Sequence, residues 1–334
     1  MAFEQLGFTL VRDIAPGEAV FLQKIPQQTR ATFTTRQIVP MASYTPDIFE
    51  YVYFARPEST VDGISVYQSR KQMGTALAKT IKTSLSLNEL SDIDSIIAVP
   101  ETSSVCAIAV AQGLKKPYVT GITRNRHILR TFIENGHEKR LKSIGRKLNL
   151  IKEEFENRNV LIVDDSIVRG STSRIIVKLA RQAGARKIYL ASCSPAIRYA
   201  HVPKPRPPDK SNNSLRHRHI YGIDLADPEE LVACNRTNVE VAEELGCDGL
   251  VYLPLDELIS SCIKARRQKL VSAFETGLFS GTYIAEVSAA TCLRAVNHVN
   301  QETLPDTMQG TLRGSVQGAS QMQAFWDAPK LVTT

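Results

Sequence analysis

The sequence lacks any long apolar run. None of its apolar stretches approaches the roughly 18 residues that a membrane-spanning helix needs. The first residues, Met1-Ala2-Phe3-Glu4, contain no apolar signal region. These absences predict a soluble, cytoplasmic protein without a membrane partner.

Cysteine is scarce and scattered. The six cysteines lie far apart, and no C-x-x-C pair is present. This spacing argues against a zinc knuckle, an iron–sulfur run and a dense disulfide framework, so we expect reduced, mainly structural thiols. The six histidines show no metal-ligand spacing with cysteine or carboxylate residues. The cysteines are Cys106, Cys193, Cys234, Cys247, Cys262 and Cys292.

The excess of positive charge is concentrated in one stretch. The formal net charge is +7, and residues 203–219 contribute five Lys or Arg against one Asp, which leaves +3 elsewhere. That stretch is rich in Pro, Ser and Asn and has no aromatic residue to stack a base. We expect a solvated insertion at 202–219 and no nucleic-acid partner, with RNA binding through this insertion as the alternative.

An α/β alternation fills the middle of the chain. With 334 residues and 43% hydrophobic content, the chain can bury a proper core. Short apolar runs alternate with segments of helical period, which predicts a parallel sheet flanked by helices, with ligands at the carboxyl ends of its strands. The apolar runs are 95–99, 159–163, 187–192 and 249–253, and the helical segments are 104–112, 171–183 and 238–245.

The most informative stretch is NVLIVDDSIVRGSTSRIIVKL, residues 159–179. It predicts a buried strand, then Asp164 and Asp165, a short loop and an amphipathic helix. The free N–H groups at the helix start can hold a phosphate, and Gly170 allows close backbone approach. Carboxylates accept hydrogen bonds from sugar hydroxyls and help to hold a hard cation. A ribose phosphate therefore fits both halves of the motif.

Two other interpretations compete with this one. In the first, Ser171 merely caps the helix and the two aspartates are solvated turn residues. In the second, the acidic pair belongs to a phosphorelay receiver that binds Mg²⁺. Receivers place that pair after their first strand, whereas at least one βα unit precedes it here.

The motif VLIVDDSIVRGSTS resembles the 5-phosphoribosyl 1-pyrophosphate (PRPP) signature of type I phosphoribosyltransferases. Its sequence most resembles that of the glutamine PRPP amidotransferase family. Further segments resemble that family in the same order, and the match runs from about residue 6 to 285. The resemblance implies the type I phosphoribosyltransferase fold, a parallel twisted sheet flanked by helices with a helical C-terminal segment. The further segments are 49–60, 62–74, 99–104, 122–132 and 221–233.

The resemblance also implies the roles of individual residues. Mg²⁺ would be held by Thr102, Asp164 and Asp165. Residues 124–147 resemble the flexible lid of the family, and within it Arg130 and Lys147 would act in catalysis on the departing pyrophosphate. The PRPP-binding residues would be Glu101, Thr102, Ser103, Asp164, Asp165, Ser166, Ile167, Val168, Arg169, Gly170, Ser171 and Thr172.

The activity implied is formation of 5-phosphoribosylamine and pyrophosphate from PRPP and ammonia, the first step of de novo purine biosynthesis. Ammonia would come from glutamine through a separate glutaminase domain. Purine nucleotides as feedback inhibitors and a homo-oligomer are implied in the same way. The alternative is a non-catalytic subunit that senses PRPP or nucleotides.

The sequence also departs from the family pattern. Residues 1–45 resemble only the end of a glutaminase domain, so we expect most of that domain to be missing. A phosphoribosyltransferase domain would follow at 46–265, and a helical segment with a polar tail at 266–334. Ile48 stands where cluster-binding members carry cysteine, and no cysteine pair lies near Phe274 to Gly277, so we expect no iron–sulfur cluster.

Overall fold

The computed structural model describes residues 6–24, 31–41, 43–125, 148–199, 230–268 and 270–284. The chain divides into two compact units, residues 1–44 with 284–334 and residues 45–283. We describe each unit by itself. Within the described ranges, no helix combines the length and the apolar character needed to cross a membrane.

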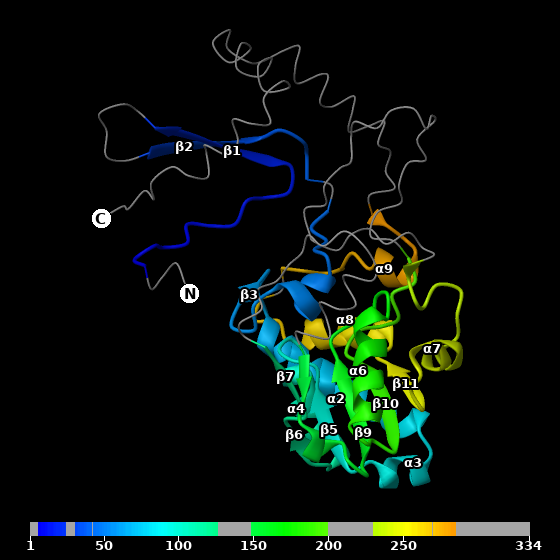
Figure 1. Ribbon diagram of the computed structural model, residues 1–334. Coiled ribbons are helices and arrows are strands. Elements are labelled where there is room, and N and C mark those ends of the chain that lie inside the picture. Colours follow the sequence, from blue (N-terminus) through cyan, green and yellow to red (C-terminus); the bar gives the residue numbers. More distant parts are fainter. Residues whose placement is uncertain are drawn as a thin grey trace, which may run out of the picture. The chain divides into compact units, whose positions relative to one another are not determined.

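The first unit contains an antiparallel hairpin of β1 (Glu18–Lys24) and β2 (Ala31–Gln37) (Figure 1). Leu22 pairs with Phe33 across the two strands, and their exposed fractions are 77% and 53%. A pair of large apolar side chains thus stays in contact with solvent in this unit.

The second unit is built on a five-stranded parallel sheet in the order β11-β10-β9-β5-β6. The three inner strands are buried along almost their whole length, which explains their nearly continuous apolar sequences. The parallel sheet predicted from the sequence is therefore confirmed. Its strands are β5 (Ser95–Ala98), β6 (Tyr118–Val119), β9 (Asn159–Asp164), β10 (Lys187–Ser192) and β11 (Gly249–Tyr252).

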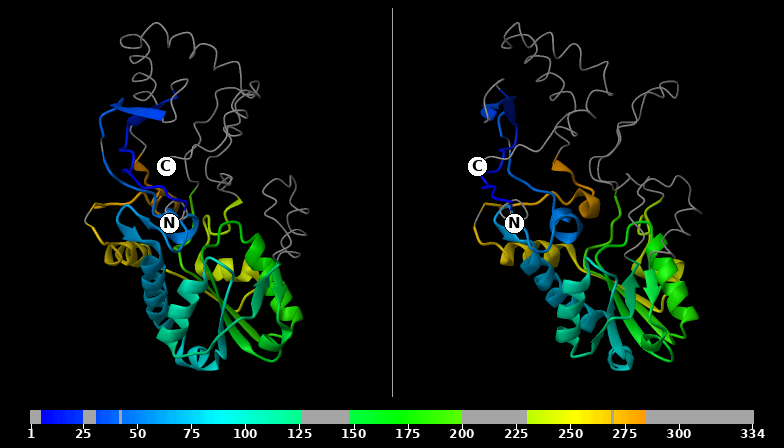
Figure 2. Two further views of the ribbon diagram at one scale, coloured as in Figure 1. Left: turned by 90° about the vertical axis from the view of Figure 1, so that its left-hand side faces the viewer. Right: turned by 60° about the vertical axis from the view of Figure 1, so that its left-hand side comes forward.

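Helices flank this sheet, with α2 and α4 on one side and α6 on the other (Figure 2). Helix α2 packs against both α4 and α8. Gly74 permits the close α2–α4 contact, because a Cβ atom there would collide with the carbonyl group of Cys106. The helices are α2 (Val66–Ser84), α3 (Leu87–Asp92), α4 (Ser104–Leu114), α6 (Ser171–Gln182), α7 (Asn238–Leu245) and α8 (Leu255–Lys264).

Local signals set the limits of α7. The hydroxyl of Thr237 accepts a hydrogen bond from Glu240 N, and the Glu240 carboxylate accepts one from Thr237 N, which forms a capping box. Gly246, with φ of 75°, ends the helix in the left-handed conformation. The predicted helix at 238–245 matches the structure at both ends.

Short elements complete the second unit, and some predicted segments lie outside the described residues. Three predicted segments lie outside the described residues: the lid residues 126–147, the insertion 202–219 and the residues after 284. The first of these includes Arg130 and Lys147. The antiparallel pair β7–β8 brackets the predicted lid in sequence. The short elements are η1 (Glu50–Phe54), β3 (Thr60–Val61), β4 (Ile64–Ser65), β7 (Ile122–Arg124), β8 (Leu148–Leu150), η2 (Lys152–Glu154) and α9 (Gly277–Ser280).

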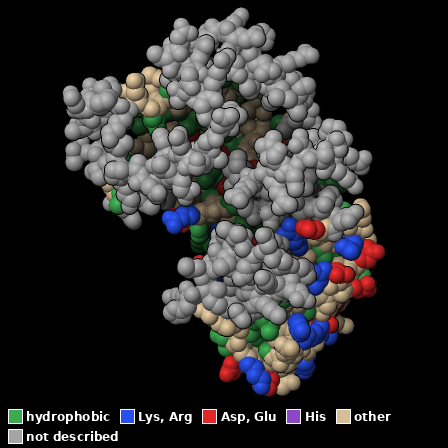
Figure 3. All heavy atoms as spheres, turned by 45° about the horizontal axis from the view of Figure 1, so that its top comes forward, with side chains coloured by type: hydrophobic (Ala, Val, Ile, Leu, Met, Phe, Trp, Pro, Cys, Tyr) green, Lys and Arg blue, Asp and Glu red, His purple; other side chains and the backbone are tan. Residues whose placement is uncertain are grey.

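Basic side chains on the described surface of the second unit are interspersed with acidic ones (Figure 3). Several arginines of the α6 region are held in ion pairs, so their charge is locally balanced. These pairs are Arg169–Glu230 at 2.7 Å, Arg174–Glu244 at 2.6 Å and Arg181–Asp248 at 2.5 Å.

Candidate active site

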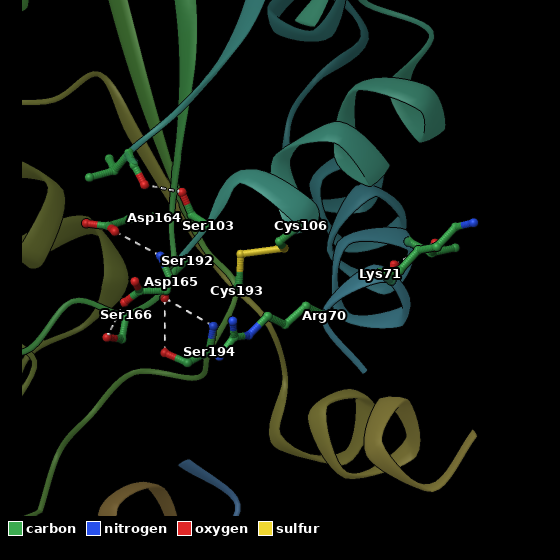
Figure 4. The surroundings of a disulfide bond; sticks show 12 residues. Arg70, Lys71, Ser103, Cys106, Asp164, Asp165, Ser166, Ser192, Cys193 and Ser194 are labelled. Atoms are coloured by element: carbon green, nitrogen blue, oxygen red, sulfur yellow. Dashed lines mark hydrogen bonds between the residues drawn. A yellow bond between two sulfur atoms is a disulfide. The ribbon is translucent and has the colours of Figure 1, made fainter. Parts of the chain in front are cut away.

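Asp164 and Asp165 lie at the carboxyl end of β9, in the middle of the sheet (Figure 4). An Asp164 Oδ1 atom accepts a 2.8 Å hydrogen bond from Asp165 N, and Asp165 Oδ1 accepts one of 2.8 Å from Ser166 Oγ. Thr102, in the loop after β5, lies close enough to the Asp165 carboxylate to lower its pKa. The fold thus brings together the three residues predicted for the metal site.

The acidic pair is held in an environment that opposes its full ionisation. Burial raises the pKa of Asp164 well above its usual value, and the neighbouring Asp165 charge adds to the effect. Burial also raises the pKa of Asp165 to about 6, against the opposing effects of Ser166, Arg70 and Thr102. A ligand that brings hydroxyl donors and a cation would stabilise the ionised form of both carboxylates.

The loop after the acidic pair ends at an open helix terminus. Helix α6 begins at Ser171, with Gly170 as its N-cap, and no described side chain caps it. Gly170 has φ of 72°, and a Cβ atom there would lie 2.7 Å from Leu245 Cδ2. The uncapped amide groups and the positive end of the helix dipole favour an anion at this terminus. The interpretation of Ser171 as a cap beside solvated aspartates is therefore wrong, since Asp165 is also only 8% exposed.

The loop itself is anchored to the rest of the protein by two of its side chains and one backbone hydrogen bond. Ile167 is buried in the hydrophobic core, and the Val168 carbonyl oxygen accepts a 3.0 Å hydrogen bond from Val232 N. Arg169 is paired with Glu230 at 2.7 Å. The loop can therefore offer its backbone and the Ser166 hydroxyl to a ligand, whereas Ile167 and Arg169 hold the loop in place.

A second loop, residues 99–103, follows β5. It contains a cis peptide bond between Pro100 and Glu101 and leads into α4. Glu101 is exposed and Thr102 is half-buried, so both can be reached by a ligand. The Ser103 hydroxyl is fully buried and donates a 2.6 Å hydrogen bond to the Val99 carbonyl oxygen, so only the backbone of Ser103 is left for the predicted contact with PRPP. A buried hydroxyl needs a partner inside the protein.

Arg70 was not predicted as part of this region. It lies on α2, is only 3% exposed, and points toward the acidic pair in Figure 4. Its guanidinium donates to the carbonyl oxygens of Tyr51, Tyr53 and Ala55 at 3.0, 3.3 and 2.8 Å. Its charge also lowers the pKa of Asp165. An arginine on the apolar face of a long helix is the signal that sequence reading could have used.

A disulfide bond between Cys106 and Cys193 corrects the expectation that all thiols are reduced. The two residues are 87 positions apart, and their Cα atoms lie 6.6 Å apart. Cys106 lies near the start of α4, and Cys193 directly follows β10. Their proximity depends on the strand order of the sheet, which cysteine spacing alone does not reveal.

The donor atoms at this site suit Mg²⁺. Within the described ranges, no group of three or more His, Cys, Asp or Glu side chains could hold a metal ion. The Thr102 hydroxyl and the two carboxylates offer only oxygen atoms. Mg²⁺ prefers oxygen, and it commonly binds through one or two carboxylates together with water and substrate phosphates. The residues therefore fit a magnesium ion that arrives with a phosphorylated substrate.

Fold and site together define a class. A parallel sheet carries an acidic pair at the end of its central strand, followed by a short loop that opens an uncapped helix. This is the type I phosphoribosyltransferase fold.

Comparison with known proteins identifies closer relatives. The amidophosphoribosyltransferase of Schizosaccharomyces pombe is 46% identical over 290 residues, 85% of this chain and 50% of that protein. The Escherichia coli amidophosphoribosyltransferase is 42% identical over 286 residues, 86% of this chain and 51% of that protein. No protein-family model matches the sequence.

A solved structure agrees with these relatives. The glutamine PRPP amidotransferase of B. subtilis, complexed with ADP and GMP, superimposes with a TM-score of 0.63 and 29% identity. The match covers 88% of this chain and 58% of that one. The chain is thus a homologue of the amidophosphoribosyltransferases, and it spans about half the length of the curated relatives it matches.

Proposed function

We propose that this chain transfers the ribose 5-phosphate group of PRPP to ammonia, forming 5-phosphoribosylamine and pyrophosphate. This is the entry reaction of purine biosynthesis. The observation that carries the proposal is the acidic pair Asp164–Asp165 at the end of β9, beside the uncapped N-terminus of α6, with Thr102 close to the Asp165 carboxylate. Homology to amidophosphoribosyltransferases supports the choice of reaction.

Each part of PRPP has a suitable partner in this arrangement. Asp164 and Asp165 accept hydrogen bonds from the ribose hydroxyls. The 5-phosphate binds the loop 166–172, where the amide groups at the start of α6 supply donors. The pyrophosphate lies against Glu101 and Thr102, whose backbone follows β5 at the same edge of the sheet. When bound, Mg²⁺ would supply positive charge to the pyrophosphate, held by Thr102, Asp164 and Asp165.

The chemistry requires stabilisation of charge more than proton transfer. As the bond to pyrophosphate breaks, positive charge develops on the ribose and negative charge on the leaving group. The buried carboxylates favour the former, and basic groups of the segment 124–147, among them Arg130 and Lys147, favour the latter. Ammonia attacks with its own lone pair, so no separate base has to activate it.

The supply of ammonia and the regulation belong to the same proposal. Glutamine would serve as a source only through a glutaminase domain. The relative of known structure was solved with ADP and GMP, which supports purine nucleotides as inhibitors of this chain too. We further propose a homo-oligomer that acts in the cytoplasm.

The test is pyrophosphate release by the purified chain with PRPP and Mg²⁺, comparing ammonium chloride with glutamine. Release that depends on ammonia is expected, and Asp164→Asn combined with Asp165→Asn should reduce it at least about 100-fold, since electrostatic groups of this kind are typically worth that much. Asp256→Asn is the matched control, because Asp256 is an exposed carboxylate in the first turn of α8.

The outcomes separate the alternatives. PRPP binding without any pyrophosphate release would support the sensor instead of the enzyme. Equal activity of the double variant and the control would contradict the site.

A further inference from the structure

We propose that Cys106 and Cys193 form a thiol–disulfide modification site that strengthens Mg²⁺–PRPP binding when oxidised and is a substrate for reduction by dithiols. The part concerning PRPP rests on the proposed function. The bond joins α4 to the segment after β10, beside the acidic pair (Figure 4).

Each cysteine is directly connected to one side of the candidate site. Cys106 lies in the first turn of α4, whose Ala107 N donates a 2.8 Å hydrogen bond to the carbonyl oxygen of Ser103 in the loop 99–103. On the other side, Cys193 N donates a 2.9 Å hydrogen bond to the carbonyl oxygen of Asp164. The disulfide thus ties the candidate pyrophosphate loop to the strand that carries the acidic pair.

This connection has a consequence for binding. Pyrophosphate and ribose are parts of one ligand, so both sides must keep a fixed separation when PRPP binds. A covalent tie fixes that separation before the ligand arrives, and less ordering remains to be done on binding. In the reduced form the two thiols pack as small apolar groups, because both residues are at most 3% exposed. The site then persists but is less restrained.

Two of the other described cysteines, Cys247 and Cys262, are free thiols that stay protonated. Burial raises the pKa of the Cys247 thiol to about 11 and that of the Cys262 thiol to about 12, and thiols rather than thiolates are slow to react. In a cytoplasm that keeps thiols reduced, a disulfide is typically transient and regulatory. A disulfide in that compartment is better explained as a bond that forms and breaks than as a permanent structural link.

The chemical step is thiol–disulfide exchange with a dithiol. A thiolate of the dithiol attacks one sulfur atom of the Cys106–Cys193 bond and forms a mixed disulfide, releasing the other cysteine as a thiolate. The second thiolate of the dithiol then displaces the remaining cysteine. The protein gains two electrons and two protons as two thiols, and the dithiol is oxidised to a disulfide.

The experiment uses the full chain, prepared once after oxidation by an oxidised dithiol and once after reduction by dithiothreitol. Iodoacetamide alkylation in denaturant, followed by mass spectrometry of peptides, reports the bond without involving PRPP. Equilibrium binding of Mg²⁺–PRPP is measured on both forms, and Kd is expected to be lower in the oxidised form by a factor on the order of 3–10. By reciprocity, Mg²⁺–PRPP should shift the dithiol equilibrium toward the disulfide by the same factor.

Matched variants complete the design. The double variant Cys106→Ala/Cys193→Ala should have the Kd for Mg²⁺–PRPP of the reduced form, and dithiothreitol should not change it. The Kd of Cys234→Ala should still differ between the oxidised and reduced forms. The reduced natural chain has the same side chains as the oxidised one, so these two forms can still be compared if the double variant fails to fold.

Alkylation of Cys106 and Cys193 in the oxidised preparation, or equal Kd values for the two forms, would overturn the inference. Loss of PRPP binding in both forms would instead overturn the proposed function, and the redox coupling with it.

Discussion

Asp165 combines two opposing demands in one side chain. A carboxylate at this position is suited to bind ribose hydroxyls and a cation, but its burial raises its pKa to about 6 from an ordinary value of 3.8. The ionised form is therefore less favourable in the folded protein than in the unfolded chain. We therefore expect the Asp165 carboxylate, which the proposed function requires, to destabilise the ligand-free protein.

We expect Asp165→Asn to stabilise the ligand-free protein at neutral pH. Because the folded pKa is raised, the cost of ionisation is fully present above about pH 6 and disappears as the pH falls toward the unfolded value. The gain should be about 1–3 kcal/mol at pH 7.5 and much smaller at pH 4.5. Urea unfolding without magnesium measures it. A gain that does not depend on pH, or one matched by Asp256→Asn, would argue against this cause.

Arg70 presents the converse case, a buried cation that organises backbone. We expect Arg70→Met to destabilise the protein by about 2–4 kcal/mol, because the carbonyl oxygens of Tyr51, Tyr53 and Ala55 lose their donor. Lys71→Met is the control, since Lys71 is the exposed neighbour on the same helix and should change stability by less than about 0.5 kcal/mol. Comparable urea midpoints for the two variants would show that the guanidinium contacts contribute little.

At the scale of elements, the loop between β9 and α6 depends on Gly170 for two reasons. Its φ of 72° disfavours other residues, and its position against Leu245 and Val232 leaves no room for a Cβ atom. Gly246, the C-cap of α7, shares the first feature with φ of 75° but not the second, since the nearest atom to a Cβ would be 3.9 Å away. The two glycines therefore allow conformational strain and steric collision to be separated.

Gly246→Ala is expected to cost about 1–2 kcal/mol from the left-handed conformation alone. Gly170→Ala should cost about 1–3 kcal/mol more and weaken Mg²⁺–PRPP binding at least about tenfold, because the loop must move away from Leu245. Urea unfolding and equilibrium binding test both variants. If Gly170→Ala lost no more binding than Gly246→Ala, the close packing of the loop would not matter for the site.

At the scale of the whole molecule, the elements that could be predicted from the sequence are those that local sequence patterns determine. The strand 159–164 and the helix 238–245 are predictable, because one is a continuous apolar run that ends in aspartates and the other has a capping box and a terminal glycine. The contacts of Arg70 with the carbonyl oxygens of residues 51–55 and the Cys106–Cys193 bond join segments that are distant in sequence. No local pattern encodes such contacts, so the structure was needed to find them.

The division into two units gives the last prediction. All described residues of the candidate site, and both cysteines of the disulfide, belong to the unit 45–283. The hairpin of the other unit exposes Leu22 and Phe33, and an isolated two-stranded hairpin is marginal in water. A shortened chain of residues 45–283 should therefore unfold cooperatively. Its Kd for Mg²⁺–PRPP should lie within about threefold of that of the full chain, a change in binding free energy of less than about 0.7 kcal/mol. Residues 1–44 alone should show no cooperative transition. Calorimetry and equilibrium binding provide the measurements, and a larger loss of affinity in the shortened chain would mean that the first unit contributes directly to the site.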